Sequence, residues 1–217
     1  MEQLILDIAL APAPTLDSFV VGRNGELLLA LHALAAGNGR DQFVYVWGQS
    51  GCGRSHLLSS VVTAAQCLGR AVFHFDVSAA AADDALVVVD DVHQLDAAAQ
   101  IDLFNLHNRL RAGHGALLVS GDAAPAHLTL RDDLKTRLAA GLIYQVHSLD
   151  DAEKAAALRG HADARGFRLS QEVADYLLSH AERDLPSLLA LLDALDAYSL
   201  ANRRAITVPL LRELLNA

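Results

Sequence analysis

The residues best suited to chemistry form a glycine-rich segment, Gly48-Gln49-Ser50-Gly51-Cys52-Gly53-Arg54-Ser55. The segment follows the apolar run Phe43–Trp47 and precedes a stretch with helical spacing, which is the setting of a phosphate-binding loop. Its glycines allow successive backbone N–H groups to turn toward an anion, and the start of the helix adds partial positive charge. The pattern therefore predicts a phosphate site. The alternative is a glycine-rich turn that binds no ligand.

Two side chains at the end of this segment bear on the chemistry. The Ser55 hydroxyl is placed to reach a Mg2+ ion beside a bound phosphate. Arg54 stands where such loops usually have lysine, and it presents a planar fork of N–H groups instead of a compact ammonium. We therefore expect a phosphate group to bind, with its placement and any turnover altered.

A pair of carboxylates follows the second strongly apolar run, Leu86–Val89. Ligands of open α/β sheets bind at the carboxyl ends of the strands, so Asp90 and Asp91 are expected near the phosphate loop. In that position Asp90 would hold Mg2+ through water, and Asp91 would polarise an attacking water. Taken alone, the pair is equally well explained as solvated acids that cap the next turn. Together with the loop, it favours a nucleotide site.

Strands and helices must alternate to bring these motifs together, and the sequence indicates that they do. Continuous β-prone runs predict strands at residues 43–47, 71–75, 86–90, 116–120 and 142–146. Helical spacing between them predicts helices at residues 24–36, 54–68 and 97–111. Such alternation predicts the α/β class: a parallel β-sheet with right-handed crossovers, flanked by helices.

The pattern changes at residue 148 and is helical from there on. We expect four helices, opened in turn by a capping box of Ser148 and Asp151, by Ser170, by Asp184 with Pro186, and by Thr207 with Pro209. The expected organisation is a tail over residues 1–9, a nucleotide-binding core over residues 10–147 and a small all-helical lid subdomain over residues 148–217.

The amino-acid composition excludes several other kinds of protein. The 217 residues are 53% hydrophobic and 20% charged, which excludes a disordered chain. A formal charge of −9, with Lys135 and Lys154 the only lysines, argues against a broad nucleic-acid-binding face. Two cysteines without a CxxC pair indicate neither a disulfide framework nor a zinc site. The acidic N-terminus does not resemble a signal peptide, so we expect a cytoplasmic protein.

In their order along the chain, these motifs resemble the AAA+ module of the bacterial replication initiator DnaA. The resemblance rests on the phosphate loop, the Asp-Asp pair, a strand ending at residues 117–122, the segment 133–138 and a helical lid. The resemblance is closer to the Hda family, the small DnaA homologues that inactivate the initiator after replication starts. It shares the sequence Gly-Arg-Ser-His-Leu-Leu at residues 53–58 and ends with the lid.

The resemblance implies roles for individual residues. ADP or ATP would bind with Mg2+, held by Ser55 and Asp90, while Asp91 would be catalytic. Ser120 and Asp122 would lie at the sensor 1 strand end, and Arg137 would be an arginine finger that reaches the ATP of DnaA in trans. The residues implied to contact the nucleotide are Val20, Val21, Gly48, Gly51, Cys52, Gly53, Arg54, Ser55 and His56. Without the family, Arg137 would be interpreted as a surface arginine.

One position departs from the family pattern. Pro186 aligns with the sensor 2 arginine of the lid, so weak or absent hydrolysis by the chain itself is expected; Arg183 would substitute only if the helix began elsewhere.

The N-terminal residues resemble the short peptide by which many proteins dock on the DNA polymerase III sliding clamp, its β subunit. Gln3 would enter a polar pocket and Leu6 and Ile8 an apolar one, and Leu4 is counted with them as clamp-binding. An edge strand explains the same residues equally well.

The function expected from these features is negative regulation of replication initiation, through nucleotide binding, clamp docking and stimulation of ATP hydrolysis by DnaA. The expected assemblies include a homo-oligomer, and neither a membrane nor a specific nucleic-acid sequence is expected as a partner. Two alternatives stay open at this point: a self-sufficient P-loop ATPase or loader, and a nucleotide-locked adaptor without any catalytic role.

Overall fold

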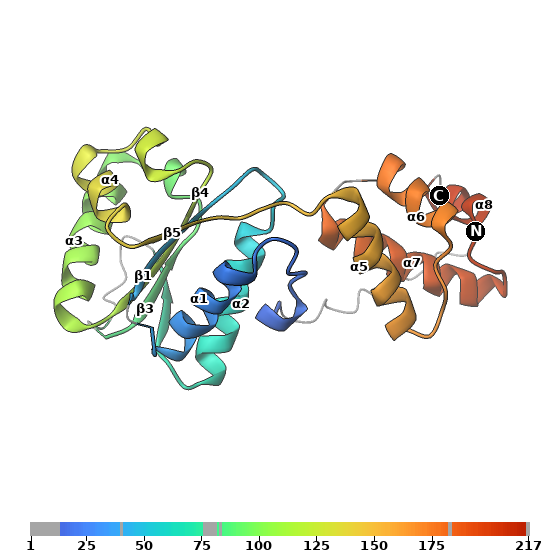
Figure 1. Ribbon diagram of the computed structural model, residues 1–217, viewed down its shortest axis with the longest axis horizontal. Coiled ribbons are helices and arrows are strands. Elements are labelled where there is room, and N and C mark those ends of the chain that lie inside the picture. Colours follow the sequence, from blue (N-terminus) through green and yellow to red (C-terminus); the bar gives the residue numbers. More distant parts are fainter. Residues whose placement is uncertain (1–13, 40, 76–81, 83, 182–183, 216–217) are drawn as a thin grey trace, which may run out of the picture. The chain divides into compact units, whose positions relative to one another are not determined.

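The computed structural model describes residues 14–39, 41–75, 82, 84–181 and 184–215, and the chain divides into two units (Figure 1). The first unit contains the residues up to Val21, Gly25–Gly48 and Gly53–Val146. The second contains Gly22–Asn24, Gln49–Cys52 and the residues from His147 onward. Each unit has its own hydrophobic core, so each is described by itself.

A parallel sheet forms the centre of the first unit. Within the described residues its strands are β1 (Phe43–Trp47), β2 (Val72–His74), β3 (Leu86–Val89), β4 (Ala116–Gly121) and β5 (Leu142–Gln145), in the order β2-β3-β4-β1-β5. All the pairings are parallel, which confirms the predicted sheet. The central strands β3 and β4 are buried along their whole length, which explains why their sequences are continuously apolar instead of alternating.

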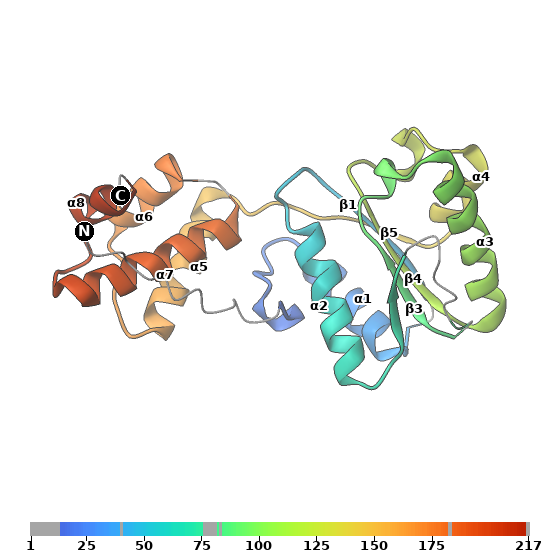
Figure 2. The same ribbon diagram turned by 180° about the vertical axis from the view of Figure 1, so that it is seen from behind.

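Helices cover both faces of this sheet. The ribbon views place α1 (Gly25–Ala36) and α2 (Arg54–Cys67) on one face, and α3 (Ala97–Gly113) and α4 (Asp132–Leu138) on the other (Figures 1 and 2). Three short 3-10 helices, all within the described ranges, connect these elements: η1 (Leu16–Ser18), η2 (Val92–Gln94) and η3 (Pro125–His127). The core beneath α3 and α4 joins strand side chains such as Tyr45 and Val119 to Leu103 and Leu134 of the helices.

The second unit is helical after residue 147. It contains α5 (Asp151–Ala164), α6 (Gln171–His180), α7 (Leu185–Asn202) and α8 (Val208–Leu215), which pack around a leucine-rich core. The caps predicted at Ser170 and Asp184 are confirmed: each side chain accepts from a backbone N–H three residues on. None of the helices in the described part of the chain is long and apolar enough to cross a membrane.

The predicted capping box of Ser148 and Asp151 is wrong. Asp150 is the N-cap of α5, and its carboxylate accepts from the Glu153 N–H at 2.8 Å. The Glu153 carboxylate in return accepts from the Asp150 N–H at 2.8 Å. Asp caps as well as Ser does, and here Glu lies at the third helical position, which completes the reciprocal pair around Asp150 and not around Ser148.

Two glycines, one inside α5 and one just after it, allow a test of backbone conformation alone, because a Cβ added at either would meet no atom within 4 Å. Gly160 lies inside the helix, whereas Gly166 follows its end at φ +85°. We expect Gly160→Ala to stabilise the chain by about 0.5–1 kcal/mol and Gly166→Ala to destabilise it by about 1–2 kcal/mol. Urea unfolding followed by circular dichroism measures both. Equal effects of the two substitutions would contradict the left-handed helix end.

Candidate functional site

Three strand ends meet at one edge of the sheet in the first unit. Because β4 pairs in parallel with both β1 and β3, the segments that follow these strands emerge side by side. The phosphate loop follows β1, the two aspartates follow β3, and Ser120 and Gly121 end β4. The predicted meeting of the loop with the acidic pair at the carboxyl edge is therefore present, as expected where ligands bind to open α/β sheets.

The loop has the backbone that a phosphate requires. Gly51 and Gly53 have φ angles of +77° and +100°, in a region of backbone conformation that residues other than glycine rarely adopt. Helix α2 begins at Arg54 with no side-chain cap, so the N–H groups of its first turn are available to an anion. A Cβ at Gly53 would lie 3.0 Å from the Phe19 ring, so the loop closely fits its surroundings.

Arg54 makes the central contacts of this site. Its Nη1 donates to the carbonyl oxygens of Gly48 at 2.7 Å and Gly121 at 2.6 Å, and its Nη2 donates to Asp91 Oδ1 at 3.0 Å. The side chain is 12% exposed. One guanidinium thus joins the segments that end β1, β3 and β4, in a geometry that a lysine ammonium could not reproduce.

The two predicted acidic residues have different surroundings. Asp90 is exposed at the end of β3, and its Oδ1 accepts from the Ser120 hydroxyl and from the Asp91 N–H. Asp91 adopts the left-handed region at φ 48° and binds Arg54 and the Gln94 amide through its carboxylate. Asp91 is therefore engaged by a cation within its own chain, while the hydrogen bond from Ser120 links Asp90 to the predicted sensor 1 strand end.

Sequence analysis missed His93, which lies beside the acidic pair. Helix η2 places His93 Nδ1 at 3.7 Å from Asp122 Oδ1 and at 3.9 Å from Asp91 Oδ1. The signal in the sequence is its position two residues after Asp91. Asp122 itself, the second predicted sensor 1 residue, has a half-exposed side chain.

The segment before α1 also contacts the start of α2. The Phe19 ring lies 5.9 Å from the His56 ring, and burial lowers the pKa of His56. Val20 and Val21, predicted from the family to contact the nucleotide, follow Phe19 directly, and Val21 is 48% exposed. Phe19 is the residue of this segment that sequence analysis missed.

Two further predicted residues of the loop, Cys52 and Ser55, have simpler surroundings. Cys52 is buried and donates its N–H to the Gln49 carbonyl at 3.2 Å, and Ser55 is exposed at the first turn of α2. In the described ranges, no group of three or more His, Cys, Asp or Glu side chains is arranged to hold a metal ion. The Mg2+ site that the sequence predicts at Ser55 and Asp90 stays a prediction.

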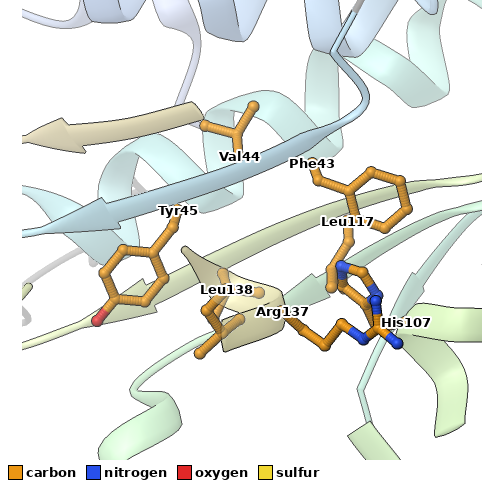
Figure 3. A pocket seen from close by; sticks show the side chains of 8 residues that line it. Phe43, Val44, Tyr45, His107, Leu117, Arg137 and Leu138 are labelled. Carbon is orange, nitrogen blue, oxygen red and sulfur yellow. The ribbon is translucent and has the colours of Figure 1, made fainter. Parts of the chain in front are cut away.

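Arg137 lies apart from the loop. Its guanidinium is 5.5 Å from the centre of the Phe104 ring, and it lines a small pocket with Phe43 and His107 (Figure 3). Phe43 begins β1, whereas Gly48 follows the other end of that strand. At about 3.3 Å per residue, the first and last residues of β1 are roughly 13 Å apart along the strand.

His107, which lines this pocket, has a strongly lowered pKa. It is 2% exposed, and its Nδ1 has no hydrogen-bond partner in the described part of the chain. Burial, and then the positive charges of Arg137 and Arg111, lower its pKa from 6.5 to about 4. The imidazole is therefore neutral at physiological pH.

The remaining predicted residues belong to the N-terminal tail and to the lid. Gln3, Leu4, Leu6 and Ile8, predicted to bind the clamp, lie outside the described residues, as does Arg183. Pro186 lies in the first turn of α7 in the second unit.

We expect Arg54→Met to lower the free energy of unfolding by about 2–3 kcal/mol, because it leaves Asp91 without its guanidinium partner and removes the side-chain donor from the buried carbonyls of Gly48 and Gly121. Arg54→Lys should recover only part of the loss. Trp47 is the single tryptophan and ends β1, so its fluorescence during urea unfolding reports on this unit. The matched control is Arg131→Met, since the Arg131–Asp133 pair is exposed and should matter little. Equal effects of the two would contradict the role of Arg54.

The buried His107 predicts a pH dependence of stability. Between pH 6.5 and about 4 the unfolded chain binds a proton at this residue and the folded chain does not, so lowering the pH through this window favours unfolding. The contribution is about 3 kcal/mol at most, complete above pH 6.5 and lost by about pH 4. Urea unfolding of the native chain and of His107→Leu across this range isolates the effect. Parallel pH profiles of the two proteins would contradict it.

Comparison with known proteins agrees with this architecture. The model of the Hda lid domain matches residues 151–215. Domain III of the replication initiator DnaA from Thermotoga maritima is 20% identical over 95% of this chain and 97% of that one, with a TM-score of 0.73. DnaA from Aquifex aeolicus, solved with AMPPCP, is 21% identical over 87% of this chain and 66% of that one, with a TM-score of 0.70.

A motor protein has the same fold. The RuvB Holliday junction branch migration motor from Thermotoga maritima is 14% identical over 94% of this chain and 71% of that one, with a TM-score of 0.67. At these identities the solved structures establish the fold alone. The chain therefore has the fold of DnaA domain III, and its residues 151–215 match the model of the Hda lid domain.

Proposed function

We propose that this chain is a negative regulator of replication initiation that promotes hydrolysis of the ATP bound to DnaA, with Arg137 as an arginine finger in trans. The observation that carries the proposal is the position of Arg137 beside Phe43, at the opposite end of β1 from its own phosphate loop. In the proposal, this guanidinium would reach a nucleotide held by another subunit, where it would stabilise charge in phosphoryl transfer.

The chain's own loop binds ADP or ATP in this proposal. The left-handed glycines and the uncapped start of α2 fit a phosphate, and Ser55 and Asp90 are the residues that would hold Mg2+ with it. The bound nucleotide supplies the phosphate charge that these donors and the metal ion neutralise. The DnaA structure containing AMPPCP supports the choice of an adenine nucleotide.

Weak turnover in this site follows from the contacts of Arg54. Asp91, the residue expected to polarise water, is paired with that guanidinium, and Pro186 stands in place of the sensor 2 arginine. These features disfavour the alternative of a self-sufficient ATPase or loader. The adaptor without a catalytic role is separated from the proposal by substitution of Arg137.

Docking on the sliding clamp completes the proposal. Gln3, Leu4, Leu6 and Ile8 would bind as an extended peptide, with Pro12 and Pro14 limiting helix formation in the segment that follows. The clamp would bring the chain to DnaA at replicating DNA, so Gln3→Ala with Leu6→Ala should abolish clamp pull-down.

We expect Arg137→Ala to remove most of the stimulation of DnaA, by a factor of about ten or more, because the lost charge acts in the transition state. The measurement is ATP hydrolysis by DnaA with the full chain and DNA-loaded clamp. Arg137→Lys should rescue little, since an ammonium lacks the bidentate fork. Nucleotide binding and clamp pull-down should stay unchanged.

Arg131→Ala is the matched control, because Arg131 precedes the same helix and forms an exposed pair with Asp133. It should stimulate DnaA as well as the native chain does. Full stimulation by Arg137→Ala would overturn the finger and leave the adaptor. Rapid hydrolysis by the chain alone would favour the self-sufficient ATPase.

A further inference from the structure

The way in which Arg137 is held differs from that of the other arginines near it. Arg131 forms two hydrogen bonds to the Asp133 carboxylate, at 2.7 and 3.1 Å. Arg137 instead lies over the Phe104 ring, and among the described residues no carboxylate is within ion-pair distance of it. Its contacts are therefore with a ring that attracts a cation without carrying a charge.

The second group in this environment is His107. Phe104 and His107 are three residues apart in α3, so both lie on the side of that helix that faces α4. Figure 3 shows Arg137 extending from α4 toward His107. The imidazole packs against Phe43 with ring centres 4.5 Å apart, and it is buried with an unpartnered Nδ1.

These contacts have an electrostatic consequence for a finger. A carboxylate would fix a guanidinium well, but it would also neutralise the charge and compete with a phosphate. An aromatic face provides an attraction of about 0.5–2 kcal/mol while the positive charge stays available to an anion. The His107 imidazole must be neutral in this arrangement, because an imidazolium beside Arg137 would repel the guanidinium.

We propose that Phe104 and His107 are positioning residues that hold the Arg137 guanidinium on α4 without neutralising it, ready for the nucleotide of a partner subunit. The inference rests on the proposed function and adds to it the residues through which the finger is placed. The charged groups around His107 agree: Arg111 of α3 and Arg137 of α4 are the groups that, with burial, keep the imidazole neutral.

The test compares Phe104→Leu, which removes the ring but keeps apolar volume, with Phe104→Tyr, which keeps the ring. We expect Phe104→Leu to lower the maximal rate of stimulated DnaA hydrolysis about three- to tenfold, with the half-saturating concentration of the chain within twofold. Phe104→Tyr should restore the rate to within twofold. Trp47 fluorescence during urea unfolding verifies that each variant is folded.

A double substitution separates positioning from general packing. In the Arg137→Ala background, Phe104→Leu should cause no further loss of rate, because the ring acts only through the arginine. Full stimulation by Phe104→Leu, failure of folded Phe104→Tyr to restore the rate, or an equal further loss in the Arg137→Ala background would overturn the inference. Full stimulation by Arg137→Ala itself would instead overturn the proposed function on which it rests.

Discussion

The hydrogen bonds of the Arg54 guanidinium are the constraint on which the carboxyl edge of the sheet depends. The strands β1, β3 and β4 are held together by their ladders. Beyond the ladders, the Gly48 N–H donates to the Gly121 carbonyl at 3.4 Å, and the Ser120 hydroxyl bonds to the segment after β3. Arg54 joins all three segments through the carbonyls of Gly48 and Gly121 and the carboxylate of Asp91. Since the side chain is nearly buried, removing it would take a donor from each of these acceptors in a place that water reaches poorly.

The same contacts assign different roles to the two arginines of the proposed function. Arg54 donates its hydrogen bonds within the chain, and one of its acceptors is Asp91, the residue expected to polarise water. Arg137 is held by the uncharged Phe104 ring and keeps its charge available. In the proposed function the chain retains its own nucleotide and acts on that of another subunit, because Arg137, and not Arg54, is the one of these two arginines without a carboxylate partner among the described residues.

Much of the fold was predictable, and the reasons differ from place to place. Buried parallel strands are continuously apolar, so Leu86–Val89 was evident from composition. The phosphate loop has required glycines, which mark its position. The α5 cap was missed because Ser148 and Asp150 are both good caps, and only the Glu153 partner distinguishes them. Contacts such as Arg54 with Gly121, 67 residues apart, depend on strand order and cannot be inferred from local pattern.

The separation of the two arginines also constrains how such a chain can act on a partner. A two-fold contact uses the same surface patch on both subunits, so it would require the finger and the phosphate loop to lie within one patch. Here Arg137 lies beside the first residue of β1, and the loop follows its last residue. A finger in trans therefore calls for a head-to-tail contact, in which one subunit presents its α3–α4 layer to the nucleotide edge of the next.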